Sequence, residues 1–149
     1  MPINAHDQPI GATIEGWVPR PRPPRTGIVG RTCRIEPLDV ARHAGPLYTA
    51  IAEDTSGASW TYLASQPQRS PADYQAYLAR VFTSDDPFCH TIIDHATGAP
   101  AGIASLMRID PANGVIEVGH IHYAPRLQRT PAATEAMFLL MRRVFDELG

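Results

Sequence analysis

The segment from Gly119 to Ala136 contains the residues that are best suited to chemistry. It reads Gly-His-Ile-His-Tyr-Ala-Pro-Arg-Leu-Gln-Arg-Thr-Pro-Ala-Ala-Thr-Glu-Ala, which predicts the end of a strand, a tight turn and the start of a helix. The first turn of a helix leaves backbone N–H groups unpaired and carries the positive end of the helix dipole, so it favours a phosphate group. Arg126 and Arg129 add positive charge beside this turn. The segment therefore predicts an anion-binding site.

Two histidines, His120 and His122, stand two residues apart in the predicted strand. If side chains alternate regularly, both histidines face away from the side that Glu117, Gly119, Ile121 and Tyr123 share.

A His-x-His pair on a strand also occurs in metal sites, so a metal-dependent enzyme using His120 and His122 is the alternative enzymatic interpretation. His90 and His95 lie on another predicted strand, but no carboxylate spacing supports them as further ligands. We therefore expect no metal and interpret His120 and His122 as candidate proton relays.

The elements that position this segment can be predicted from caps and periodicity. Ser70-Pro71 and Thr130-Pro131 each combine a hydroxyl cap with a proline at the first helical position. The patterns predict a short strand near 30–37, helices at 39–51, 70–81 and 130–148, and antiparallel strands at 88–95, 101–109 and 115–123. The last helix is apolar over a wide arc, so it requires cover on more than one side.

The length and the composition of the chain are typical of a single globular domain. The 149 residues include 44% hydrophobic residues, carry a formal net charge of −2 and contain two cysteines, a balance that argues against nucleic-acid binding and against a disulfide framework. We expect no membrane association and a cytoplasmic location, because no apolar run approaches the length of a membrane span and no signal-peptide pattern opens the chain. The proline-rich and arginine-rich residues 1–28 are expected to form an extended arm, and residues 29–149 the domain.

The predicted turn resembles that of a known family. Gln128-Arg-Thr-Pro-Ala-Ala133 is similar to the pyrophosphate loop of the GCN5-related N-acetyltransferases (GNAT), whose pattern is Gln/Arg-x-x-Gly-x-Gly/Ala, and the order of elements over 29–149 is similar as well. Ala133-Thr-Glu-Ala136 and Ile116-Glu-Val-Gly119 resemble the RimJ/RimL branch. Pro131 departs from the pattern, since the family has glycine there. At the first helical position, however, the donor that proline lacks has no partner within the helix anyway.

The resemblance implies a mixed α/β (α+β) fold, with a mostly antiparallel sheet flanked by helices, and acetyl-CoA as co-substrate. It implies direct attack of a primary amine, either a protein N-terminus or a small amine, on the thioester. A backbone N–H near Ile121 to Tyr123 would polarise the thioester carbonyl. Glu117 is the first candidate for the general base, followed by His120 and His122. The residues that the resemblance assigns to acetyl-CoA are Ile121, His122, Tyr123, Gln128, Arg129, Thr130, Pro131, Ala132, Ala133 and Thr134.

The family pattern continues past the cofactor helix with another strand, a helix and two more strands, whereas this sequence stops at Gly149. We therefore expect the N-terminal two-thirds of the fold, with little activity and with self-association through the 115–123 strand and the 136–148 helix. The alternative from another class is an inactive CoA-binding or interaction fragment.

Overall fold

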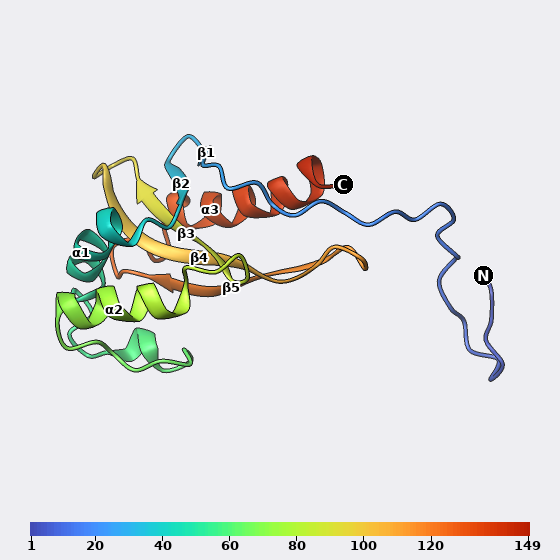
Figure 1. The fold of residues 1–149 in the computed structure, drawn as a ribbon, viewed down its shortest axis with the longest axis horizontal. Coiled ribbons are helices and arrows are strands. Elements are labelled where there is room, and N and C mark those ends of the chain that lie inside the picture. Colours follow the sequence, from blue (N-terminus) through green and yellow to red (C-terminus); the bar gives the residue numbers. More distant parts are fainter.

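The computed structural model describes residues 1–149, which form one antiparallel sheet with helices on both faces (Figure 1). The strands follow one another in chain order across the sheet, and each pairs with its sequence neighbour. The strands are β1 (Ile28–Val29), β2 (Cys33–Pro37), β3 (Phe88–Asp94), β4 (Ala99–Asp110) and β5 (Val115–Tyr123). The helices are α1 (Val40–Ile51), the short 3₁₀ turn η1 (Ala58–Trp60), α2 (Pro71–Val81), α3 (Pro131–Arg142) and the π-helical turn η2 (Arg143–Glu147).

Local capping determines where the three long helices begin. The side chains of Asp39, Ser70 and Thr130 each accept a backbone N–H from the third residue along, so each occupies an N-cap position. Pro71 and Pro131 follow two of these caps at the first helical position. These contacts confirm the helix starts expected from the sequence.

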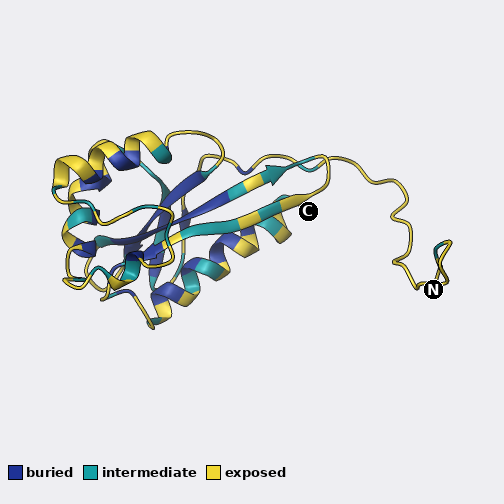
Figure 2. Cartoon of the chain, turned by 90° about the horizontal axis from the view of Figure 1, so that it is seen from below, coloured by how far each residue is buried: buried dark blue, intermediate teal, exposed yellow.

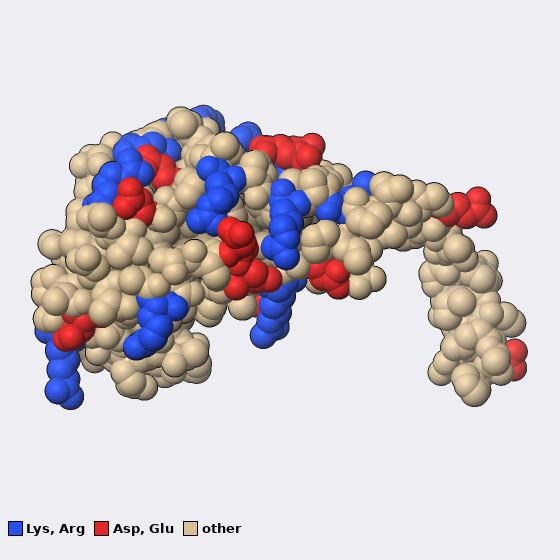
Figure 3. All heavy atoms as spheres, in the orientation of Figure 1, with Lys and Arg blue, Asp and Glu red and all other residues tan.

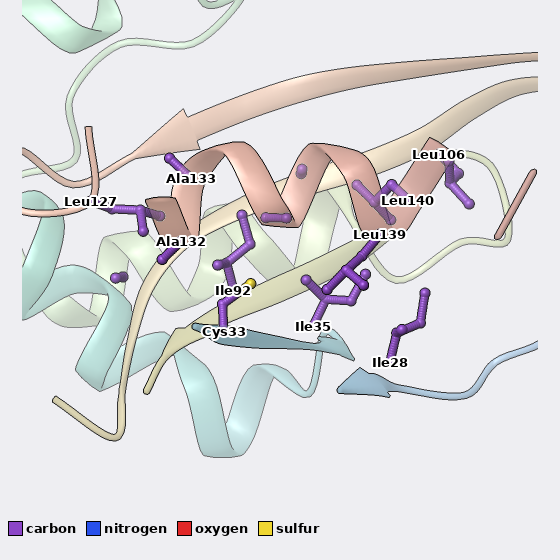
Figure 4. Close-up of a cluster of buried hydrophobic side chains, with 13 residues drawn as sticks. Ile28, Cys33, Ile35, Ile92, Leu106, Leu127, Ala132, Ala133, Leu139 and Leu140 are labelled. Carbon is purple, nitrogen blue, oxygen red and sulfur yellow. The ribbon is translucent and has the colours of Figure 1, made fainter. Parts of the chain in front are cut away.

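Two hydrophobic clusters lie on opposite faces of the sheet. One joins α1, α2 and η1 to Cys89 and Ile103. The other joins α3 to the opposite face, including Ile35, Ile92 and Leu106 (Figure 4). Ala132, Ala133 and Ala136 are the buried residues of the first half of α3, and their small side chains let this part of the helix lie close to the sheet.

Three local features differ from the expected elements. The two-residue strand β1 (Ile28–Val29) forms an edge of the sheet where the sequence shows no alternation. Its Ile28 side chain is buried in the hydrophobic cluster under α3. The turn η1 forms where no helix is expected. The final helix changes to π-helical geometry at Arg143, whose guanidinium group is buried and donates to the carbonyl groups of Thr26 and Gly27.

Residues before β1 form an exposed, extended arm that leaves the body of the domain (Figures 1 and 2). Its inner part contacts the β4–β5 hairpin, where the Trp17 indole N–H donates to the Ala112 carbonyl over 2.8 Å. The Arg20 guanidinium carbon lies 4.6 Å from the Trp17 ring centre, a cation–π contact. Gly114 permits this docking, since a Cβ there would come within 2.5 Å of the indole.

Positive and negative side chains are interspersed over the face shown in Figure 3, as the near-neutral composition predicts. Cys33 and Cys89 are both buried and unpaired. No helix is both long enough and apolar enough to cross a bilayer.

His90 is a buried titratable group that makes the fold sensitive to acid. Its ring packs 4.2 Å from that of Phe88, and neither ring nitrogen has a hydrogen-bond partner in the chain. Burial, and after it the charge of Arg143, lower the pKa of His90 from 6.5 to about 4. The unfolded chain therefore binds more protons than the folded chain between pH 6.5 and 4, so stability falls as the pH falls through that window.

Because of His90 alone, we expect the free energy of unfolding to be about 3 kcal/mol lower at pH 4 than at pH 6.5. His90→Leu keeps a similar volume without the titration, so urea denaturation at several pH values should give a flatter dependence for the variant. Equal slopes for the variant and the wild type would contradict this role of His90.

Candidate functional site

A β-bulge near the end of β5 determines which side chains gather at the site. Ile103 pairs with His122 and Ser105 pairs with Gly119, so the single residue Ala104 of β4 lies opposite two residues of β5. His120 occupies the bulge with a φ of +47°, a left-handed conformation that is rare for a residue with a side chain.

The expected alternation of β5 is therefore wrong. Glu117 pairs with Met107 and His122 pairs with Ile103, and these two β4 residues are an even number apart, so they share the α1/α2 face. The extra residue in the bulge brings His122 onto the same face as Glu117, where regular alternation would place it opposite. Tyr123 faces α3 instead, and its hydroxyl donates to the Ala133 carbonyl over 3.5 Å.

His122 is held in a fixed position on that face. It is 4% exposed. Its Nε2 atom lies 3.0 Å from the Ser59 hydroxyl, and its ring packs edge-on against Trp60 with centres 4.3 Å apart. Burial lowers the pKa of His122 from 6.5 to about 4, and the charge of Asp54 acts in the opposite direction. The imidazole is therefore neutral at pH 7.

A cavity of about 200 Å³ opens in front of the two histidines. Its walls come from α2, from the loop before α2, and from β4 and β5. The lining is Leu63, Ala64, Ser65, Tyr77, Val81, Phe82, Ile103, His120 and His122. The His120 ring packs against Phe82 at 5.2 Å. No carboxylate lines this cavity, so its polar character comes from the two imidazoles, the Tyr77 phenol and Ser65.

Glu117 lies outside the cavity. Its carboxylate accepts a hydrogen bond from the Arg108 guanidinium over 3.0 Å, and its side chain is 45% exposed. The β4 partners of Glu117 and His122, Met107 and Ile103, are four residues apart, so Glu117 lies roughly 13 Å from His122 along the sheet. The structure therefore separates the first-ranked base candidate from the two histidines.

The loop before α3, where the sequence predicts an anion-binding site, leaves several backbone amides unpaired. Thr130 caps the helix by accepting the Ala133 N–H over 3.2 Å, so that amide already has a partner. The amides of Arg129, Thr130 and Ala132 donate to no other group of the chain. Arg129 has a φ of +59°, and the Gln128 side chain ties the loop to β5 by donating to the Tyr123 carbonyl over 3.0 Å. Three unpaired donors thus remain at the positive end of the α3 dipole.

A groove of about 1110 Å³ runs from this loop along α3. Arg31, Arg129 and Arg142 line it, together with the exposed side of Thr134 and the edge of Phe138. Glu135 is the acid in its wall, but its carboxylate is bonded to backbone amides. The free charges facing the groove are therefore positive, as a polyphosphate ligand requires.

Glu135 fastens the first turns of α3 to the β1–β2 turn. Its carboxylate accepts the amides of Arg31, Thr32 and Cys33 over 2.8, 2.6 and 3.1 Å, and the Thr32 hydroxyl over 2.5 Å. Burial raises its pKa, but these hydrogen bonds outweigh that effect and lower the pKa from 4.5 to about 2. Gly30 allows the close approach, because a Cβ there would lie 2.6 Å from the carboxyl carbon.

We expect Glu135→Ala to lower the free energy of unfolding by about 2–4 kcal/mol, because it leaves three amides without their charged acceptor. Glu135→Gln keeps one acceptor oxygen and should lose about half as much. Chemical denaturation at pH 7 measures both variants. The contribution of the carboxylate is present above pH 4.5 and is lost as the pH falls towards about 2, so the wild type and Glu135→Ala should converge in acid. A difference in unfolding free energy between the wild type and Glu135→Ala that persists at pH 2 would contradict this role of the Glu135 carboxylate.

Sequence reasoning missed Asp54, Ser59 and Glu135. The spacing of Asp54, Ser56 and Ser59 ahead of Trp60 is typical of a side-chain-stabilised loop, a signal that was available. Glu135 lies in the Ala133–Ala136 segment that resembles the RimJ/RimL branch, but nothing local indicated its partners, which lie 102 to 104 residues away.

The metal alternative needs a third ligand beside His120 and His122, which line the same cavity. His90 does not supply it, because it lies on the α3 side of the sheet. No group of three metal-ligating side chains converges on one point.

Comparison with known proteins gives consistent results. The family model described as an acetyltransferase (GNAT) domain matches residues 33–149. No curated protein matches the chain. Among solved structures, a GCN5-related N-acetyltransferase from Brucella melitensis superposes with a TM-score of 0.88 at 44% identity, covering 91% of this chain and 62% of that one. A probable GNAT-family acetyltransferase from Chromobacterium violaceum gives 0.83 at 30% identity, covering 100% of this chain and 72% of that one.

The chain thus spans 62% of the length of the Brucella melitensis structure. The match to the family model extends from β2 to the last residue, and the antiparallel sheet with its three helices has the GNAT fold. By its sequence and by its fold, the chain belongs to the GNAT acetyltransferase family.

Proposed function

We propose that this chain takes part in the transfer of an acetyl group from acetyl-CoA to a primary amine. The observation that carries the proposal is the start of α3, where three unpaired amides, the α3 dipole and Arg129 meet beside the groove of about 1110 Å³. The diphosphate of CoA is a ligand that such a site would hold. The family membership supplies acetyl transfer as the reaction.

Strand β5 supports the placement of the thioester. It is the edge strand of the sheet and pairs with β4 alone, so alternate backbone amides point away from the sheet. The bulge at His120 interrupts the pairing directly beside the cavity. We propose that a free amide between Ile121 and Tyr123 polarises the acetyl carbonyl, with the amine entering from the cavity.

The lone pair of a neutral amine forms a bond to the acetyl carbon, and the C–S bond breaks, with its electrons leaving on sulfur. The nitrogen gives up one proton, the thiolate takes up one proton, and the products are an N-acetyl amide and CoA. An amine held in a poorly solvated cavity is favoured in its neutral, nucleophilic form.

We further propose the RimJ/RimL branch of the family, on the residues Ile116–Gly119 and Ala133–Ala136. The acceptor is then a protein N-terminus or a small amine. Because the cavity has no carboxylate to hold a second ammonium group, an acceptor with one amine is favoured over a polyamine.

Thermal unfolding with and without CoA, combined with acetylation of a panel of primary amines, tests the proposal. CoA at 100 times its Kd should stabilise the chain by about 2.7 kcal/mol. Stabilisation together with turnover is the expected result, and stabilisation without turnover would indicate a cofactor-binding chain. Absence of stabilisation by CoA would refute the proposed site.

A further inference from the structure

The loop between α1 and η1 is built around one carboxylate. One carboxylate oxygen of Asp54 accepts hydrogen bonds from the Ser56 amide and hydroxyl, over 3.2 and 2.6 Å, and from the Gly57 amide, over 3.0 Å. Its second oxygen accepts the Ser59 amide over 2.8 Å. Hydrogen bonds from the Ser56 hydroxyl and the Ser59 amide lower the pKa of Asp54, so it stays charged. These contacts fix the position of Ser59.

Ser59 and Trp60 then hold the imidazole of His122. The Ser59 hydroxyl lies 3.0 Å from Nε2, and the Trp60 ring packs against the imidazole. The other ring nitrogen, Nδ1, forms no hydrogen bond within the chain, although the ring lines the cavity. His122 is therefore anchored at one nitrogen and free at the other.

The negative charge of Asp54 beside Ser59 favours one of the two tautomers of His122. One oxygen of the carboxylate is held 2.8 Å from the Ser59 amide nitrogen, so its negative charge favours a Ser59 hydroxyl whose hydrogen is turned towards Asp54. The hydroxyl oxygen then accepts a hydrogen bond from His122, which requires the proton on Nε2. Nδ1 keeps its lone pair as a consequence.

We propose that Asp54, Ser59 and His122 form a relay in which His122 Nδ1 takes the proton of the acceptor amine as the new N–C bond forms. His122 is the catalytic residue of the relay, while Ser59 and Asp54 are positioning residues. The assignment of the proton acceptor depends on the acetyl transfer proposed above, whereas the tautomer of His122 does not.

The proton balance suits a weakly basic imidazole. The attacking nitrogen becomes strongly acidic only once it bonds to the acetyl carbon, so a neutral imidazole with a lowered pKa is able to accept its proton. The imidazolium then formed donates from Nε2 to Ser59, whose backbone amide is bonded to the Asp54 carboxylate. Tyr77 from α2 and His120 from β5 are the other titratable groups around the cavity, and neither carries negative charge at pH 7.

Nitrogen NMR of the His122 ring tests the relay without any cofactor. The wild type should show the Nε2–H tautomer at pH 7. Ser59→Ala and Asp54→Asn should shift the ring towards a mixture of tautomers, and Ser59→Thr, which keeps the hydroxyl, should restore the wild-type spectrum. An Nδ1–H tautomer in the wild type, or a spectrum unchanged by Ser59→Ala, would overturn the proposal.

Kinetics supply the second measurement, with thermal unfolding to show that each variant is folded. Ser59→Ala should lower kcat about 10–100-fold and change its pH profile, leave the Kd for CoA unchanged and be rescued by Ser59→Thr. Turnover unaffected by Ser59→Ala would overturn the relay. If no amine is acetylated at all, the acetyl-transfer proposal fails, and the NMR result still decides the tautomer.

Discussion

Thr134→Glu is expected to weaken CoA binding at least 100-fold. Thr134 is exposed at the first turn of α3, beside the unpaired amides and in the wall of the groove. A carboxylate about 4 Å from a phosphate charge is repelled by about 4 kcal/mol near a protein surface, which exceeds a factor of 100 in affinity. An acid in the first turn also suits the helix dipole, so the fold should be retained.

Calorimetric titration with CoA measures this effect. Thr134→Gln serves as the matched control, because it adds similar length without charge and should bind within about threefold of the wild type. Raising the salt concentration should reduce the difference in CoA affinity between the two variants, because salt screens the repulsion between the carboxylate and the phosphates. Equal affinities for the Glu and Gln variants would place the diphosphate elsewhere.

His122→Gln is expected to lower kcat about 10²–10⁴-fold while leaving the Kd for CoA unchanged. The Gln amide retains a hydrogen-bonding group near Ser59 but accepts no proton. A low imidazole pKa also predicts that the wild-type rate is insensitive to His122 protonation above about pH 5, since the ring is neutral there.

Glu117→Gln is the informative comparison for that experiment. The Glu117 carboxylate is half exposed, paired with Arg108 and outside the cavity, so its loss should change the rate by less than about threefold. The reverse result, a large loss for Glu117→Gln and a small one for His122→Gln, would restore Glu117 as the base and exclude His122.

The sequence was sufficient to predict most of the fold because its signals are local. The hydroxyl-then-proline pairs at Ser70 and Thr130 mark helix starts through contacts within three residues. The strands alternate, and their turns contain glycine at positive φ, as at Gly98 and Gly114. The resemblance at residues 128–133 then located the loop that the structure shows to have unpaired amides.

The arrangement of the candidate site around His122 could not be predicted in this way. The bulge at His120 depends on how β5 pairs with β4, and no glycine marks the left-handed residue. One extra residue reversed the face on which His122 was expected relative to Glu117. Ser59 and Asp54 come from a loop more than 60 residues earlier, and tertiary contacts of Ser59 and Trp60 with the His122 ring hold this loop beside it.

The contact between Glu135 and the turn at residues 31–33 also bears on how the chain folds. It closes a loop of more than one hundred residues, so it is formed at high entropic cost and is expected after the α1–α2 layer and the β3–β4–β5 meander, whose contacts are mostly closer in sequence. An interaction made after the rate-limiting barrier slows unfolding without accelerating folding. The Glu135 contacts at the start of α3 are therefore expected to slow unfolding, and so to lengthen the lifetime of the folded loop before α3 once the rest of the sheet is in place.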